Sequence, residues 1–347
     1  MDTWKLEHGE KEDIHEYYTG KENIKEEDSL TYLGHVISKS GGNMPNIIHK
    51  RKKAIGTEKL ILRLIKNLGP YKYTGALIYI QSLIRTSILY SAETMYNLTE
   101  TEMRALEQIE ESVLQKVFQT KRSCPRHILY LESGIYPARN QIHRQMLNFL
   151  HYILQQPSDS LIYRIFETQK NHPTKGDWVS CVIELVNVYD LQLSIEEIKN
   201  TKKSVFKNLV KNQVEKVAFE QLLKRQKGGQ KGKKIVYENL EMADYLLPEC
   251  QATPEEKSQI LQIRSEMDDY PSNFGNKTKC DMGCSETLNS EHILVCSILN
   301  EKDTNFLRYE HILKGTMNEK LHIFRKIQHN NEKRKHLLRD SVEDSKL

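Results

Sequence analysis

Three cysteines and one histidine near the C-terminus have the residue types and spacing of a metal site. Cys280, Cys284, His292 and Cys296 form a Cys-x3-Cys-x7-His-x3-Cys array. Zn²⁺ prefers four tetrahedral sulfur and nitrogen ligands, and short spacers let paired ligands reach one ion. His292 and Cys296 are four positions apart, so a helix would place both on one face. Four protein ligands leave no open position for water, so the array predicts structural Zn²⁺ and not a catalytic metal. The alternative is four unrelated residues in a polar loop.

Two basic clusters are candidates for contacts with phosphate groups. The chain has a net charge of +4, but residues 1–30 carry −6, so the remainder carries +10. Clusters of this density can neutralise phosphates and release counterions. The alternative for each is a solvated face or a flexible linker. The first cluster follows His49 and the second lies in a Lys/Gly-rich stretch; their members are Lys50, Arg51, Lys52 and Lys53, and Lys224, Arg225, Lys227, Lys231, Lys233 and Lys234.

Composition narrows the class of protein. Six cysteines in 347 residues are too few for a disulfide framework, and the chain starts without an apolar signal segment. We therefore expect an intracellular protein of the nucleus, the cytoplasm or both, where clustered cysteines favour metal. The most apolar stretch, residues 76–90, is interrupted by Gln81 and Arg85, so we expect no membrane contact. No pattern indicates a small-molecule substrate.

Periodicity predicts a mainly α-helical fold. A hairpin is expected around Tyr18–Lys21 and a strand at Leu30–Ser38, and apolar residues then recur at helical spacing. Capping boxes at Thr99, Ser194 and Thr253 mark helix starts. The apolar stripes are core-packing signals. We expect a thumb-like helical bundle with a small N-terminal β-hairpin and a C-terminal CCHC zinc knuckle. The predicted segments are an acidic and β part at 1–45, the bundle at 46–156, a helical connector with a basic loop at 157–235, a helix and knuckle at 236–300, and a charged helical tail at 301–347.

Several blocks, in order, resemble the C-terminal part of non-LTR (LINE-type) retrotransposon reverse transcriptases. The resemblance covers roughly residues 12–300 and includes the end of the palm, the thumb and a zinc knuckle. The blocks that carry it are Tyr32–Gly41 with His49–Lys53, Ser82–Glu93, Leu129–Pro137 continuing through Arg144 and Phe149, Tyr245–Leu247, Ile263–Ser265, Asn273–Phe274 and the Cys/His array.

The resemblance implies a role for several of these residues. Tyr32 and Gly34 would belong to the primer grip, which positions the primer end. Lys50–Lys53 and Arg85 would contact phosphates, which position a strand without reading its sequence. The knuckle would bind element RNA or target DNA, with Lys277 and Lys279 beside it. Three tyrosines are possible stacking residues, with core packing as the alternative: Tyr71, Tyr73 and Tyr79.

The catalytic residues of such a polymerase are not recognisable in this sequence. The family's paired aspartates, which hold two metal ions, would precede Tyr32, and the 31 residues before it contain no such pair. Met267–Tyr270 contains two aspartates but lacks flanking apolar strands. No Pro-Asp of an endonuclease follows Cys296. We therefore expect no catalysis by this chain alone and no bound Mg²⁺.

Three functions remain open. The chain is a nucleic-acid-binding remnant that contacts RNA, DNA or both; or a truncated fragment of an active RNA-directed DNA polymerase; or a helical protein-interaction scaffold stapled by zinc. An aromatic-Ala-Asp-Asp sequence encoded upstream would indicate the second. Nucleic-acid affinity with little salt dependence would favour the third. A fourth alternative is that the chain is a fragment that does not fold on its own.

Overall fold

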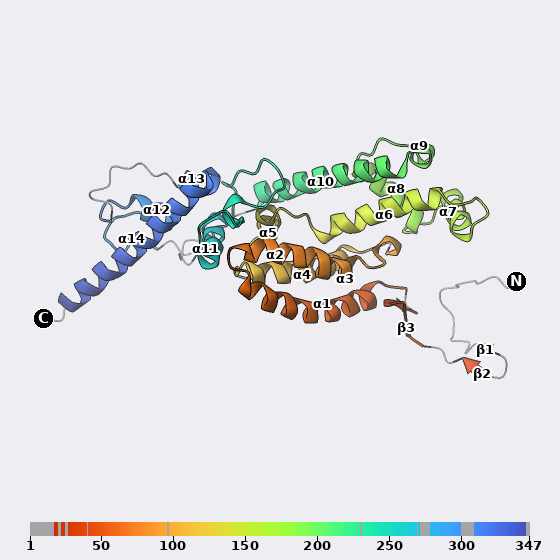
Figure 1. The fold of residues 1–347 in the computed structure, drawn as a ribbon, viewed down its shortest axis with the longest axis horizontal. Coiled ribbons are helices and arrows are strands. Elements are labelled where there is room, and N and C mark those ends of the chain that lie inside the picture. The colour runs from red at the N-terminus through yellow and green to blue at the C-terminus, as the bar shows by residue number, and fades with distance from the viewer. Residues whose placement is uncertain are drawn as a thin grey trace.

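The computed structural model describes residues 17–19, 22–24, 27–39, 41–95, 97–229, 231–268, 270, 278–299 and 309–344. The described chain is mainly helical with short β-hairpins near its N-terminal end, which confirms the predicted fold class (Figure 1). The strands are β1 (Tyr17–Thr19), β2 (Glu22–Ile24), β3 (Ser29–Tyr32) and β4 (His35–Ser38). The helices are α1 (Met44–Leu64), α2 (Lys72–Tyr79), α3 (Arg85–Leu89), α4 (Glu100–Val117), α5 (Arg126–Ser133), α6 (Ala138–Leu154), α7 (Leu161–Asn171), α8 (Trp178–Val188), α9 (Ile195–Asn200), α10 (Lys203–Gly228), α11 (Pro254–Arg264), α12 (Ser290–Val295), α13 (Glu310–Lys314) and α14 (Met317–Asp344).

The helices form a bundle from which α14 extends. Helix α1 packs on α4, and α10 runs along α6, with α5 beside its C-terminal part (Figure 1). A π-helical turn at Ile80–Ile84 joins α2 to α3. Buried apolar side chains from Ile47 to Ile327 form one cluster, to which every predicted segment after residue 45 contributes. The predicted division of the chain into segments stays a prediction.

Local sequence explains where the helices start. The three predicted capping boxes are present: in each, a Ser or Thr side chain accepts from the backbone N–H three residues later, and a Glu there reaches back. These pairs satisfy N–H groups that a helix start leaves without partners. Pro254 also fits the first turn of α11, where a missing N–H costs nothing.

The predicted strand at 30–38 is wrong in one respect, because the segment is a hairpin. Strands β3 and β4 pair antiparallel, with Tyr32 opposite His35. Leu33 and Gly34 form the turn with φ of 46° and 83°. Positive φ at both central positions is typical of the type I′ turn of two-residue hairpin loops, and glycine adopts it without strain.

Two further differences concern helices. Residues 126–133 form α5, a helix of eight residues between Pro125 and Gly134 that is too short for its apolar periodicity to indicate it. Helix α10 continues to Gly228, so Arg225 and Lys227 lie on a helix and not in the predicted loop. None of the described helices combines the length and the apolarity that crossing a membrane requires.

Candidate metal centre and nucleic-acid interface

The structure brings the four predicted metal ligands together. The ligand atoms of Cys280, Cys284, His292 and Cys296 all lie within 4.8 Å of one another. The Cys284 sulfur is 3.1 Å from His292 Nε2 and 3.9 Å from the Cys296 sulfur. A disulfide would need a separation of about 2 Å, and all these cysteines are free. The cluster can therefore hold one metal ion between three sulfurs and one nitrogen.

A short hairpin positions the first two cysteines. The backbone N–H of Cys280 donates to the carbonyl of Glu286 at 2.8 Å, and that of Leu288 donates to Thr278 at 2.9 Å. Gly283 turns the chain between the cysteines with φ of 90°, a conformation that a residue with a Cβ rarely adopts. The turn folds Cys284 back toward Cys280.

Helix α12 positions His292, and Cys296 follows its last residue. The Asn289 side chain caps the helix by accepting from the backbone N–H of His292 at 2.7 Å. The helix ends at Val295, and Cys296 is its C-cap. The prediction that Cys296 shares a helix with His292 is therefore wrong. Both side chains are nevertheless buried in the cluster, His292 at 8 % exposure and Cys296 at 1 %.

Helix α14 holds this Cys/His module (residues 278–299) in place. Asn330 donates to the carbonyl of Ile293 at 3.0 Å, and Lys333 donates to that of Leu299 at 2.8 Å. The Arg334 guanidinium lies 2.6 Å from the carboxylate of Asp281, a residue between the first two cysteines in the sequence. The sequence predicted only a charged tail here, because no spacing rule links residue 330 to residue 293.

The Cys284 thiol lies in surroundings that resist its ionisation unless a cation is bound. Burial, followed by the neighbouring thiols of Cys280 and Cys296, raises the pKa of Cys284 to about 12. Metal ligation requires thiolates, so binding a cation here must release protons.

The first basic cluster divides into exposed and buried members. Arg51, Lys52 and Lys53 are exposed on α1, whereas Lys50 is buried at 3 % exposure. A hollow of about 380 Å³ lies between α1, α3 and the hairpin turn. Its lining includes Gly34, Lys50 and Lys53 of the predicted site, with Leu33, His49, Thr86, Ser87 and Tyr90. Tyr32 lies beside the turn and is 62 % exposed.

The Lys50 ammonium is held by uncharged groups. Its Nζ donates to the carbonyls of Tyr90 at 2.6 Å and Ser87 at 3.3 Å. Among the described residues neither Lys50 nor Lys53 makes an ion pair. Burial, followed by the charge of Lys53, lowers the pKa of Lys50 to about 8, while Glu93 acts in the opposite direction.

Arg85 is not a surface phosphate contact, which corrects the prediction. It is 5 % exposed, and its Nε lies 2.5 Å from the Glu110 carboxylate. Its Nη2 donates to the carbonyl of Tyr136 at 2.5 Å. Burial lowers the pKa of Arg85, but Glu110 outweighs it and the net shift is upward. Arg85 is an ion-paired core residue.

The second basic cluster is partly engaged within the protein. Lys224, Arg225, Lys227 and Lys233 are exposed. Lys231 donates to the carbonyl of Glu266 at 3.3 Å, and Lys234 lies 3.1 Å from the Glu291 carboxylate. Lys279 is exposed beside the candidate metal ligands, whereas Lys277 lies outside the described residues.

A second basic hollow was not predicted from the sequence. It has a volume of about 680 Å³ and lies along α4, and its lining includes Arg51 of α1, Arg122 and Arg126. Lys116 and Glu111 also line it. Arg122 precedes α5, whose position the sequence did not indicate. Of the possible stacking tyrosines, Tyr71 is 62 % exposed and Tyr79 half-buried, whereas Tyr73 is fully buried and donates to the carbonyl of Pro254.

Comparisons of the chain with protein-family models, with curated proteins and with solved structures found no match. The resemblance to reverse transcriptases therefore stays a prediction based on the residues that carry it.

Proposed function

We propose that this chain binds nucleic acid as a zinc-stabilised helical module, and that it corresponds to the palm end, thumb and zinc knuckle of a non-LTR retrotransposon reverse transcriptase without its catalytic aspartates. The hollow at the Leu33–Gly34 turn carries the proposal. There two ammonium groups, Lys50 and Lys53, face a cavity without an ion-pair partner among the described residues. A phosphate group would supply the missing negative charge.

The exposed residues of α1 extend this charge across the surface. Arg51 and Lys52 lie on the same helix, and Arg51 also lines the basic hollow along α4. Contacts of this kind fix the position of a phosphate backbone but do not read bases. The arrangement therefore supports binding to a duplex or strand backbone and leaves base recognition to another part of the chain.

Zn²⁺ is the metal that best fits the Cys/His module. Two thiolates bound to one tetrahedral Zn²⁺ lie about 3.8 Å apart, given a Zn–S distance of about 2.3 Å, and Cys284 and Cys296 are 3.9 Å apart. Three thiolates and one imidazole are a common ligand set of structural zinc. The four ligands would close the site, so the ion would stabilise the module and not activate water.

Contacts between the blocks that carry the resemblance are consistent with one folded unit. Arg85 of the second block donates to the Tyr136 carbonyl of the third, and Arg264 of a later block pairs with Glu132 of the third.

The described aspartate of the 267–270 stretch, Asp268, accepts a hydrogen bond from Ser290, and Asp269 lies outside the described residues.

Salt-titrated binding to duplex DNA and structured RNA, with zinc measured on the same sample, tests this function. We expect one zinc per chain and an affinity that falls steeply with salt. Lys52→Gln with Lys53→Gln should lower the slope of log affinity against log salt by about 2 on duplex DNA. Lys207→Gln with Lys211→Gln removes two exposed charges from α10 and is the matched control. Affinity that hardly changes with salt would instead indicate the protein-interaction scaffold.

A further inference from the structure

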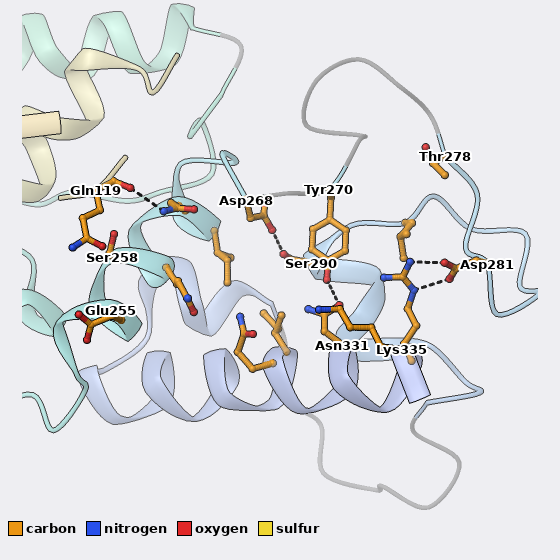
Figure 2. A pocket seen from close by; sticks show the side chains of 17 residues that line it. Gln119, Glu255, Ser258, Asp268, Tyr270, Thr278, Asp281, Ser290, Asn331 and Lys335 are labelled. Carbon is orange, nitrogen blue, oxygen red and sulfur yellow. Dashed lines mark hydrogen bonds and ion pairs between the residues drawn. The ribbon is translucent and has the colours of Figure 1, made fainter. Parts of the chain in front are cut away.

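A polar cleft separates α11 from α14 beside the Cys/His module. It has a volume of about 550 Å³, within the range of ligand pockets. Gln119, just after α4, lies at one end, and Tyr270, Ser290 and Asp281 lie toward the other (Figure 2). The cleft uses none of the four metal ligands and none of the predicted phosphate contacts.

The two helices face the cleft with polar stripes at the spacing of a packing face. Residues three, four, seven and eight apart share one side of a helix, and between neighbouring helices that side is normally apolar. Here the stripes are Glu255, Ser258, Gln259, Gln262 and Ile263 on α11, and Ile327, Gln328, Asn331, Arg334 and Lys335 on α14. Ile263 and Ile327 are the apolar members of these stripes, and the amides of Gln259, Gln262, Gln328 and Asn331 stand where further aliphatic side chains would close the gap between the helices.

The amides keep unused hydrogen-bonding groups. Among the described residues, the side chains of Gln259 and Gln328 have no hydrogen-bond partner. The Tyr270 hydroxyl donates to Asn331 Oδ1 at 2.6 Å, which leaves the Asn331 NH₂ free to donate (Figure 2). Gln262 donates from Nε2 to the Gln119 carbonyl at 3.1 Å and keeps its own oxygen as an acceptor. Donors and acceptors therefore line both walls.

The charged side chains of the cleft give it no net positive charge, because three carboxylates, those of Glu255, Asp268 and Asp281, line it with two cations, Arg334 and Lys335. Asp281 is paired with Arg334, and Asp268 accepts from Ser290. Glu255 and Lys335 are exposed and of opposite sign. The cleft therefore lacks the net positive charge that would attract a phosphate, unlike the hollow at the Leu33–Gly34 turn, which is called the α1 hollow below. The lining suits an uncharged ligand with several donors and acceptors.

We propose that the cleft between α11 and α14 receives an unpaired nucleobase, whose edge is read by Gln259, Gln328 and Asn331. Asn and Gln side chains pair with base edges through two hydrogen bonds. Proteins recognise RNA sequence mainly through single-stranded bases that can enter a pocket. Lys335 and Lys279 are exposed near the module and can contact the flanking phosphates. This inference rests on the proposed nucleic-acid binding and supplies the base recognition that the basic surfaces lack.

The test compares strands that differ only in their bases. A single-stranded RNA of about 15 nucleotides, a length that one binding module can cover, and an abasic strand of the same length and charge are titrated with the full chain. We expect the base-bearing strand to bind about tenfold more tightly, near the lower end of the range for one bidentate amide–base contact. Gln259→Ala with Gln328→Ala should remove most of this difference and leave affinity for the abasic strand and the salt slope unchanged.

Two controls separate the possible outcomes. Gln213→Ala with Gln251→Ala removes two amides outside the cleft and should keep the preference for bases. Crosslinking with 4-thiouridine should label residues of α11 or α14. Equal, salt-dependent affinity for both strands would overturn the cleft proposal and leave the proposed function standing. No binding to either strand would overturn both, and capture of a peptide in the cleft would replace the base by a protein ligand.

Discussion

The guanidinium of Arg264 lies 2.9 Å from the carboxylate of Glu132, and both side chains are buried. Glu132 also accepts hydrogen bonds from the hydroxyls of Tyr237 at 2.5 Å and Tyr245 at 2.7 Å. Arg264 donates to the carbonyls of Ile312 and Leu313, each at 2.6 Å. The pair thus joins α5 of the bundle to α11 and, through α13, to the helix that holds the metal module.

Breaking this pair should destabilise the whole chain. Glu132→Gln leaves the buried Arg264 charge uncompensated, which costs about 3–5 kcal/mol of unfolding free energy. The measurement is denaturant unfolding followed by circular dichroism. Arg325→Gln removes a partner of Glu256 from an exposed pair and should cost no more than about 1 kcal/mol. Equal losses in the two variants would show that the Glu132 pair has no special role.

Arg85 should behave as a core residue. Arg85→Gln separates the buried Glu110 carboxylate from its cation and removes the contact with the Tyr136 carbonyl. We expect a loss of about 3–5 kcal/mol in unfolding free energy, with an unchanged salt slope for nucleic-acid binding by the folded protein. A variant of full stability whose slope falls by one phosphate contact would restore the phosphate role that the sequence predicted.

Removal of the metal should unfold the Cys/His module before the bundle. The hairpin and α12 are short, and structural zinc commonly supplies the folding energy of such modules. Cys284→Ser, or chelation, should abolish bound zinc and make residues 278–299 susceptible to limited proteolysis, while most helical circular dichroism remains. Cys181→Ser, a half-buried cysteine on α8, is the matched control and should keep one zinc per chain. Full zinc occupancy in Cys284→Ser would contradict the ligand assignment.

The helix starts and the grouping of the four candidate metal ligands were predictable because their signals are local. A capping box spans four residues, and the Cys/His array spans one hairpin and one helical turn. The burial of Arg85 was not predictable, because its partners, Glu110 and Tyr136, belong to other elements and no spacing links them to it. The turn at Leu33–Gly34 had a signal, since glycine often occupies two-residue hairpin loops, but the apolar run around it indicated one strand.

Two further features could not be predicted because they depend on tertiary contacts. They are the hydrogen bonds by which α14 holds the Cys/His module, and the cleft between α11 and α14. In the sequence, Gln328 and Asn331 look like ordinary polar positions of a charged helix. Only the folded structure shows that they lie opposite α11. The burial of Lys50 was not predictable either, because Lys50 belongs to a basic cluster that the sequence indicates to be exposed to solvent. Its burial depends on the carbonyls at the end of α3, which the chain reaches only after the turn at Leu68–Tyr71.

Binding at the α1 hollow should weaken as pH rises through about 8. Lys50 has its pKa lowered to about 8 by burial and then by Lys53, with Glu93 opposing. His35 of β4 also faces Lys50, and burial, followed by the charge of Lys50, lowers its pKa, so it is neutral in this range. An anion binds better when the Lys50 ammonium is protonated. Above the pKa, Lys50 of the free protein is mostly neutral and must take up a proton on binding. The affinity therefore falls by at most about tenfold per pH unit above the pKa. Anisotropy titrations of a short duplex at constant ionic strength, between pH of about 7 and 9, measure this. Lys50→Arg keeps its charge across the range and should flatten the profile, whereas an identical fall in both proteins would place the titrating group elsewhere.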